Sequence, residues 1–225
     1  MTTIVIEANY DSWVDDTVYT KQDSDDQLYW GLAEKGGDCN TALRFPLTTL
    51  PETVEAGDIS QVRLHLYCES AGEEGHLTNV HPYGGDGQDD PNLDDGETFW
   101  DKCNDGTPYL EDSTAFQTTG YKWLVLSSAS HAAIVAAKSA VNRMSFGCVC
   151  SLEHEWTVCT VESIDELGSS NEPELEITYG EEEPARNDLL KDIPQIFIKR
   201  LPKPTLRRPF SGVMREYRRL LRPRI

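Results

Sequence analysis

Short stretches in which apolar and polar residues alternate are the feature that most limits how this chain can fold. Residues 62–67 put Val62, Leu64 and Leu66 on one face of a strand, because successive strand side chains point to opposite faces. Eight segments with strand character occur, separated by loops rich in Gly, Pro, Asn and Asp: residues 3–8, 43–47, 62–67, 77–80, 121–126, 145–150, 155–161 and 175–179. This spacing is typical of an antiparallel sandwich.

One segment departs from the two-residue period. Residues 130–142 are rich in alanine and carry Ile134, Val135 and Val141 at helical spacing, which predicts a helix across one end of the sandwich. The sequence therefore predicts an all-β fold, an antiparallel jelly-roll-like β-sandwich with one short helix, over residues 1–180. A body of about 180 residues can bury most of its apolar surface as one domain.

The charge of the chain is divided between this body and a C-terminal arm. Residues 193–225 hold ten basic side chains and one acidic side chain, Glu216, so their net charge is +9. Because the whole chain has a net charge of −19, residues 1–192 carry −28. A body this acidic repels a phosphate backbone, so nucleic acid is disfavoured as its partner. The longest apolar runs are far below the roughly 20 residues of a transmembrane helix.

The arm, residues 181–225, combines basic and apolar side chains. Its prolines exclude a long helix before residue 210, and Ser211 can cap a final short amphipathic helix to about Leu221. The alternatives are a disordered solubility tail, a nucleic-acid or membrane-surface arm, and an extended docking arm for a protein partner. Its apolar content favours docking, and the predicted docking residues are Ile196, Phe197, Ile198, Arg207, Arg208, Phe210, Met214, Arg218 and Leu221.

Several body segments resemble the DNRLRE-type domain, a β-sandwich akin to carbohydrate-binding modules. The similar segments, in chain order, are Ala8-Asn9-Tyr10-Asp11-Ser12-Trp13-Val14, Leu28-Tyr29-Trp30-Gly31, Ala42-Leu43-Arg44-Phe45-Pro46-Leu47, the run 59–67, Thr98-Phe99-Trp100, and Pro173-Glu174-Leu175-Glu176-Ile177-Thr178-Tyr179. They cover about residues 3–180 in the family's order. The resemblance implies a carbohydrate-binding-like sandwich.

The acidic loop at residues 86–112 is a candidate metal site. It contains ten carboxylates and a single basic residue, Lys102. Asp90, Asn92 and Asp94 lie at alternate positions, as oxygen ligands do at the start of a calcium loop, although the glycine comes one place late. The alternatives are a structural calcium ion as a cofactor and a solvated loop without metal.

Aromatic residues beside carboxylates are the second candidate site, because aromatic faces stack on sugar rings while carboxylates accept hydroxyl hydrogen bonds. Tyr83, Trp100, Asp101 and Tyr109 are the predicted carbohydrate-binding residues, with packing in the sandwich as the alternative for each aromatic ring.

The six cysteines lack a C-x-x-C pair, and we expect mainly free, buried thiols rather than disulfides. A zinc site at Cys148, Cys150, His154 and Cys159 is the alternative, with spacings unlike those of structural zinc. No nucleophile elbow and no H-E-x-x-H motif occurs, so the prediction is a protein without catalytic activity.

These features together predict a non-enzymatic structural or adhesion protein, displayed on a larger assembly and anchored by its basic arm. A virion decoration, head-fibre or tail component fits them, with capsid or tail proteins or copies of itself as partners. Because the N-terminus lacks a basic segment followed by an apolar one, we expect synthesis in a host cytoplasm without a signal peptide. The alternative is a polysaccharide-binding module of a cell-surface or secreted protein.

Overall fold

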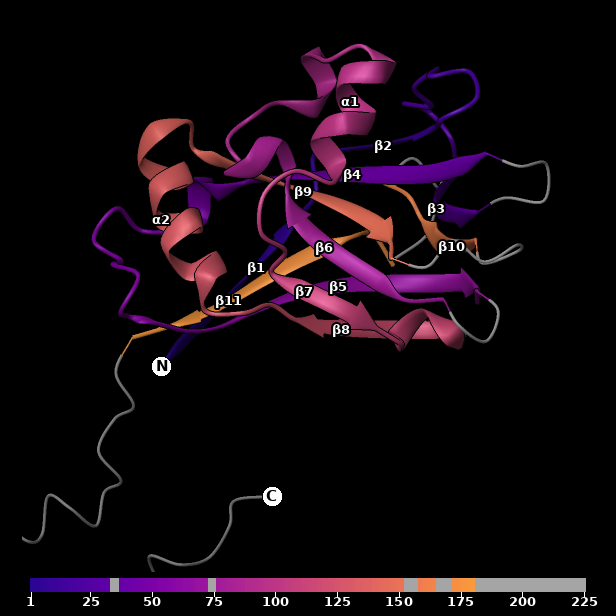
Figure 1. The fold of residues 1–225 in the computed structure, drawn as a ribbon. Helices are drawn as coiled ribbons and strands as arrows, with labels where there is room; N and C mark the ends of the chain where they lie inside the picture. The colour runs from indigo at the N-terminus through magenta and orange to yellow at the C-terminus, as the bar shows by residue number, and fades with distance from the viewer. Residues whose placement is uncertain (33–36, 73–75, 152–157, 165–170, 181–225) are drawn as a thin grey trace, which may run out of the picture. The chain divides into compact units, whose positions relative to one another are not determined.

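The computed structural model describes residues 1–32, 37–72, 76–151, 158–164 and 171–180. These residues form a sandwich of antiparallel strands with two α-helices on its outside (Figure 1). The strands are β1 (Thr2–Glu7), β2 (Tyr10–Asp15), β3 (Gln27–Leu32), β4 (Asp38–Pro46), β5 (Ile59–Ser70), β6 (Thr78–Pro82), β7 (Leu110–Ser113), β8 (Gly120–Val125), β9 (Arg143–Cys150), β10 (Cys159–Glu162) and β11 (Glu174–Tyr179). The helices are α1 (Gly96–Cys103) and α2 (Ala129–Ala140).

All pairings between the strands are antiparallel, and they form one curled sheet with two facing halves. The first half, which we call sheet A, runs β1-β11-β5, with β8 on the free side of β5 and β10 and β3 continuing from its far end. The second half, sheet B, runs β2-β4-β9-β6-β7. β3 joins the halves, because it pairs with both β10 and β4.

The main core fills the space between the two sheets. Its largest fully buried side chains include Trp30, Phe45, Phe116 and Phe146. Trp30 packs edge-on against Phe116 at 4.9 Å between ring centroids and donates its indole N–H to Thr78 Oγ1 at 3.0 Å. The most deeply buried indole therefore has a partner for its polar atom, as a dry core requires.

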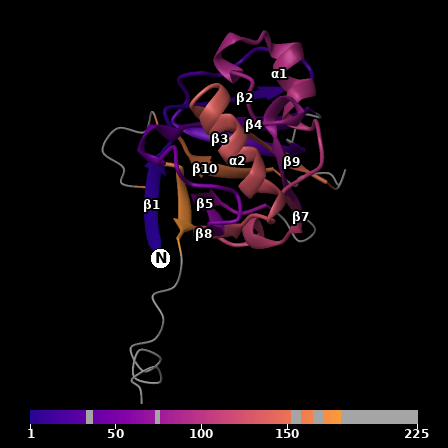
Figure 2. The same cartoon turned by 90° about the vertical axis from the view of Figure 1, so that its left-hand side faces the viewer.

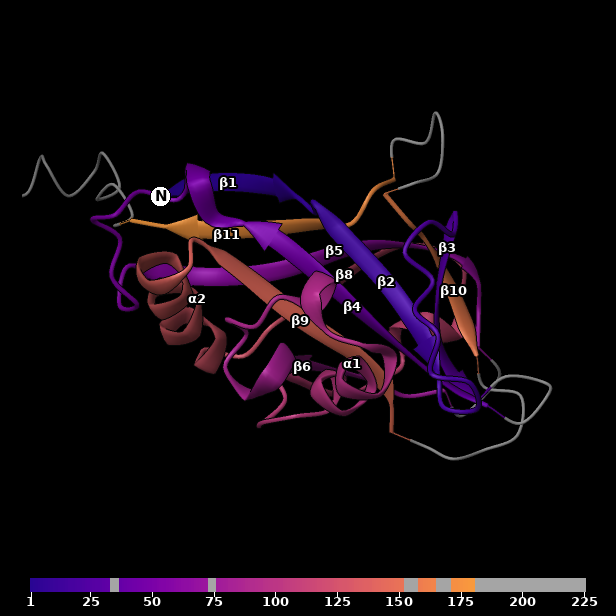
Figure 3. The same cartoon turned by 90° about the horizontal axis from the view of Figure 1, so that it is seen from above.

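The helix α2 closes one end of the sandwich (Figure 2). Its inward side chains include Ile134 and Ala137, which join the main core, while the buried ammonium of Lys138 reaches Glu52 at 3.0 Å and Asn142 at 2.9 Å. The predicted helix at residues 130–142 is thus confirmed. The structure adds a second helix, α1, in the segment that the sequence treats as an acidic loop, and Figure 3 shows it over β4 and β9, on the outside of sheet B.

Five of the six cysteines, Cys39, Cys68, Cys103, Cys148 and Cys159, are buried with free thiols, as expected, and Cys150 is half-buried. Burial raises the pKa of Cys148 to about 12, so this thiol stays protonated at neutral pH. No helix in the described part of the chain is long and apolar enough to cross a membrane. The predicted arm helix and docking residues lie in 181–225, outside the described residues.

Candidate functional site

The outer face of sheet B carries a second apolar cluster, which explains why a helix covers it. We call it the outer cluster: Tyr10, Val14, Ala42, Tyr83, Phe99, Cys103 and Val149, with Trp100 partly buried against it. Phe99 and Cys103 come from α1, and the ring of Tyr83 meets that of Phe99 at 5.6 Å. α1 therefore removes an apolar sheet face from water, and Trp100 lies at the margin of the contact.

Local chemistry fixes where α1 begins and how closely it approaches the sheet. The Asp95 carboxylate accepts the amide N–H of Thr98 at 2.8 Å, an N-cap that lowers the pKa of Asp95. A Cβ on Gly147 would lie 2.1 Å from the carbonyl oxygen of Cys103, so only glycine allows the helix to sit this close. The position of Trp100 therefore depends on contacts that a local sequence pattern does not display.

The acidic loop is neutralised by basic side chains of the protein. Asp90 accepts a hydrogen bond from Arg44 at 2.6 Å, and Lys102 lies 2.8 Å from Asp89 and 3.0 Å from Asp94. Asp94 also accepts the hydroxyl of Tyr83 at 2.9 Å. Burial alone would lower the pKa of Lys102, but its hydrogen bonds to Asp89 and Asp94 outweigh that effect, and the pKa is raised.

These contacts bear on the predicted calcium ligands. Asp90 is directed to Arg44, Asp94 to Lys102, and the Asn92 carbonyl accepts Lys21 at 3.2 Å. Within the described residues, no group of three or more His, Cys, Asp or Glu side chains is placed to hold a metal ion. Calcium binding stays a prediction. The zinc alternative includes His154, which lies outside the described residues.

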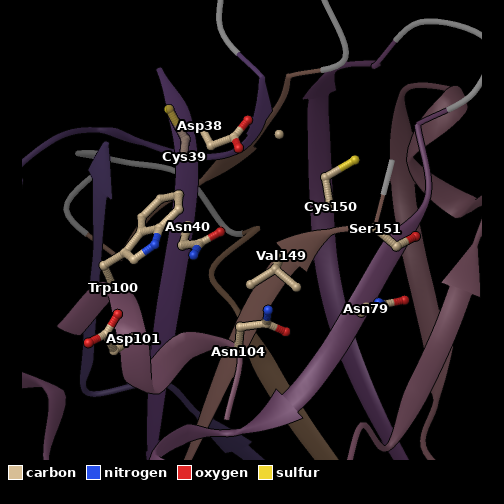
Figure 4. A pocket seen from close by; sticks show the side chains of 11 residues that line it. Asp38, Cys39, Asn40, Asn79, Trp100, Asp101, Asn104, Val149, Cys150 and Ser151 are labelled. Carbon is tan, nitrogen blue, oxygen red and sulfur yellow. The ribbon is translucent and has the colours of Figure 1, made fainter. Parts of the chain in front are cut away.

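Beside α1, the outer face of sheet B is hollowed into an open cleft of about 500 Å³ (Figure 4). Trp100 and Asp101 of α1 line one side, Asn40 of β4 and Val149 of β9 form its floor, and Cys150 and Ser151 lie on the opposite side. We call this the Trp100 cleft; its other lining residues are Gly31, Asp38, Cys39, Asn79 and Asn104. A half-buried indole, three side-chain amides and two carboxylates are thus among the groups that line one hollow.

The chemistry of the Trp100 cleft suits binding of hydroxyl groups. Side-chain amides both donate and accept hydrogen bonds, and carboxylates accept them, while the indole offers an apolar face. The thiol of Cys39 is a poor nucleophile, because burial and then the nearby Asp15 and Asp38 raise its pKa to about 12. Cys39 therefore offers the cleft no thiolate nucleophile at neutral pH.

The structure brings together two of the four predicted carbohydrate-binding residues. Trp100 and Asp101 both line the cleft. Tyr83 is fully buried beneath α1, and Tyr109 is 6% exposed, with its ring 6.2 Å from that of Phe146 in the main core. Tyr83 and Tyr109 therefore support the walls of the sandwich and do not face the cleft.

A second aromatic surface lies on the outer face of sheet A, and it was missed by the sequence prediction of the site. Tyr121, Trp123 and Val125 of β8 are 59%, 55% and 51% exposed, and we call them the β8 stripe. The signal was present in the sequence, because Leu124 and Leu126 face the core and the residues alternating with them must face outward.

Charged residues of the neighbouring strands border the β8 stripe. The ring of His65 lies 4.0 Å from that of Trp123, and the guanidinium of Arg63 lies 5.6 Å from the Trp123 ring centre. Beyond them, Glu174 and Glu176 of β11 face His65 and Arg63 in register. A shallow hollow of about 330 Å³ lies among these side chains.

The fold and these surfaces define a β-sandwich protein with an aromatic-lined polar cleft on one sheet and an exposed apolar stripe on the other. Comparison with protein-family models and with curated proteins finds no match to this chain. The resemblance to the DNRLRE-type domain stays a prediction.

Proposed function

We propose that this chain is a non-enzymatic structural and adhesion protein whose sandwich is displayed on a larger assembly and holds a glycan in the Trp100 cleft. The observation that carries the proposal is the cleft itself, which is lined by the Trp100 indole, the Asn40 and Asn104 amides and the Asp101 carboxylate. A ring of this kind stacks on the apolar face of a sugar, and the amides bind its hydroxyls.

The charge of the body narrows the class of glycan. Residues 1–192 carry a net charge of −28, and Asp38 and Asp101 add negative charge at the cleft. Uronic acids and sulfated sugars would be repelled, so the proposed ligand is a neutral or amino-sugar polysaccharide.

The basic arm is the proposed anchor. The net charge of +9 on its residues 193–225 opposes that of the body, and its apolar side chains give it surface to bury on a partner. Under this proposal the assembly is a virion, and the chain is a decoration, head-fibre or tail component at its surface.

Glycan binding is tested by screening the full-length protein against a glycan array and measuring affinities by calorimetry. Trp100→Ala should weaken binding of a captured glycan about tenfold, equivalent to about 1.4 kcal/mol. Trp123→Ala is the matched control, because it removes an indole from the opposite sheet and should leave the affinity unchanged. Absence of glycan binding, or equal loss in both variants, would contradict the cleft assignment.

A second candidate function, a polysaccharide-binding module of a cell-surface or secreted protein, uses the same cleft and gives the arm no anchoring role. Deleting residues 187–225 separates the two. Loss of assembly with intact glycan binding supports the anchored protein. If the truncated protein still formed the same particle or oligomer, the anchored protein would be excluded and the binding module would be the remaining function.

A further inference from the structure

The outer edge of β8, on the side away from β5, carries backbone groups that no described strand pairs, next to apolar side chains. β8 pairs only with β5 among the described strands. The Leu126 amide donates to the Val62 carbonyl, and this bond identifies which residues of β8 direct their backbone groups toward β5. Residues 122, 124 and 126 therefore bond to β5, and the amides of Tyr121, Trp123 and Val125 point away from it. Proteins normally pair, cover or charge such an edge.

A hollow continues from this edge toward the other sheet. Val125 and Leu126 line one side of a cavity of about 500 Å³, and Tyr109, Leu110 and Glu111 line the other. The amide of Ser127 donates to the Tyr109 carbonyl at 2.8 Å and closes one end of this gap, so an added strand would pair along Tyr121–Val125. Leu110 and Glu111 belong to β7, the last strand of sheet B. An added strand at β8 would therefore place its alternate side chains in this hollow and over the β8 stripe.

Charge indicates what kind of segment fits. Four of the eight exposed large hydrophobic residues of the described chain, Val5 and the β8 stripe, lie on the outer face of sheet A. The carboxylates of Glu172, Glu174 and Glu176 line the hollow beside them. A second acidic body would be repelled at this face, whereas an apolar segment with basic residues would be attracted.

We propose that the β8 edge binds the segment 195–201 of a second copy of this chain, Gln-Ile-Phe-Ile-Lys-Arg-Leu, as an added strand. The inference rests on the proposed anchoring role of the arm and names its partner surface. The segment belongs to the one net-basic part of the chain, its β-branched and aromatic residues suit a strand, and Lys199 and Arg200 carry charge opposite to the net charge of the acidic body.

Two full-length variants test the proposal by complementation. The arm variant carries Ile196→Asp and Ile198→Asp; the edge variant carries Trp123→Lys and Val125→Lys, substitutions of exposed residues with the side chain that natural sheet edges use to prevent pairing. Sedimentation velocity should show association of the wild-type protein, at least tenfold weaker association of each variant alone, and a complex restored when the variants are mixed.

Several results would overturn the proposal. These are a wild-type protein that stays monomeric, an edge variant that associates normally, or a mixture that stays monomeric although both variants keep the wild-type circular dichroism. Trp100→Ala is the control and should associate as the wild type does.

If the edge variant misfolds, hydrogen exchange on the wild-type protein still decides the question. The amides of Tyr121, Trp123 and Val125 should become at least tenfold more protected as protein concentration rises. Protection that is absent or independent of concentration would exclude binding by a second copy. Normal incorporation of the edge variant into its assembly, with loss of incorporation in the arm variant, would refute this inference and leave the proposed anchoring intact.

Discussion

Replacing Lys102 with methionine tests whether an internal cation holds the acidic loop and α1 in place. The ammonium of Lys102 lies 2.8 Å from Asp89 and 3.0 Å from both carboxylate oxygens of Asp94. The side chain of Asp94 is 15% exposed and that of Asp89 is 46% exposed, so water screens the contact with Asp89 far more than the contact with Asp94. Methionine keeps the length of the side chain and removes the charge.

The expected loss of stability follows from these exposures. The exposed contact with Asp89 contributes below about 1 kcal/mol, and a half-buried carboxylate that loses its partner costs about 1–3 kcal/mol. We therefore expect Lys102→Met to lower the free energy of unfolding by about 2 kcal/mol, or the melting temperature by about 4–8 °C for a domain of this size. Lys102→Arg keeps the charge and should lose less than half as much.

Thermal unfolding followed by circular dichroism, with and without 1 M NaCl, measures this loss. Salt reduces the Debye length to about 3 Å, so the difference between the wild type and Lys102→Met should shrink in salt. Calcium should partly restore the variant, because Asp89 and Asp94 are then free to bind a cation. A variant that melts within about 1 °C of the wild type, or a salt-independent loss, would refute the electrostatic reasoning.

The pH dependence follows from the raised pKa of Lys102. A base whose pKa is higher in the folded state contributes its full stabilisation below the unfolded value, about 10.4, and loses it as pH rises through the folded value. The difference between wild type and Lys102→Met should therefore be constant from pH 7 to 9 and narrow only above about pH 10.4. A difference that changes across neutral pH would assign the effect to another group.

Three further predictions concern the packing around the cleft. Gly147→Ala should cost about 1–3 kcal/mol in thermal unfolding and weaken glycan binding, because its Cβ meets the Cys103 carbonyl; unchanged melting would contradict this contact. A thiol reagent should label about one thiol per native chain, at the half-buried Cys150, and rapid labelling of more than two would contradict the burial of the rest. Trp30→Phe removes the hydrogen bond to Thr78 and should lower the free energy of unfolding by about 1–3 kcal/mol, seen as a lower denaturant midpoint at unchanged slope; a midpoint equal to that of the wild type would show that the bond is dispensable.

The strands were largely predictable because their patterns are local. Residues 62–67 alternate cleanly, and they lie within β5, where Val62, Leu64 and Leu66 are buried as expected. β2, β3 and β7 lie outside the eight predicted segments. In β7, at residues 110–113, four polar or half-exposed residues carry no periodic signal, and among the described strands they pair with β6 alone.

The helix α1 could not be predicted for a different reason. Its first residue is Gly96, and Thr98, Phe99 and Trp100 are poor helix formers. The Asp95 cap and the burial of Phe99 on the outer face of sheet B stabilise it instead. The Asp95 cap can be read from the sequence only once a helix is suspected there, and the burial of Phe99 is a tertiary contact that the sequence does not display.

The two outer sheet faces differ in the side chains that they present to water, and this difference bears on Trp100, which was a predicted binding residue, and on Trp123, which was not. Strands β2, β4 and β9 place Val14, Ala42 and Val149 outward, and such a face needs a cover, which α1 provides. Strands β5 and β11 place charged residues outward, including Arg63 and Glu174, and such a face can remain in water. Apolar outward positions therefore indicate the covered outer face of sheet B, and charged outward positions indicate the open outer face of sheet A. Because β8 belongs to the open face of sheet A, its aromatic residues Tyr121 and Trp123 remain accessible to a partner.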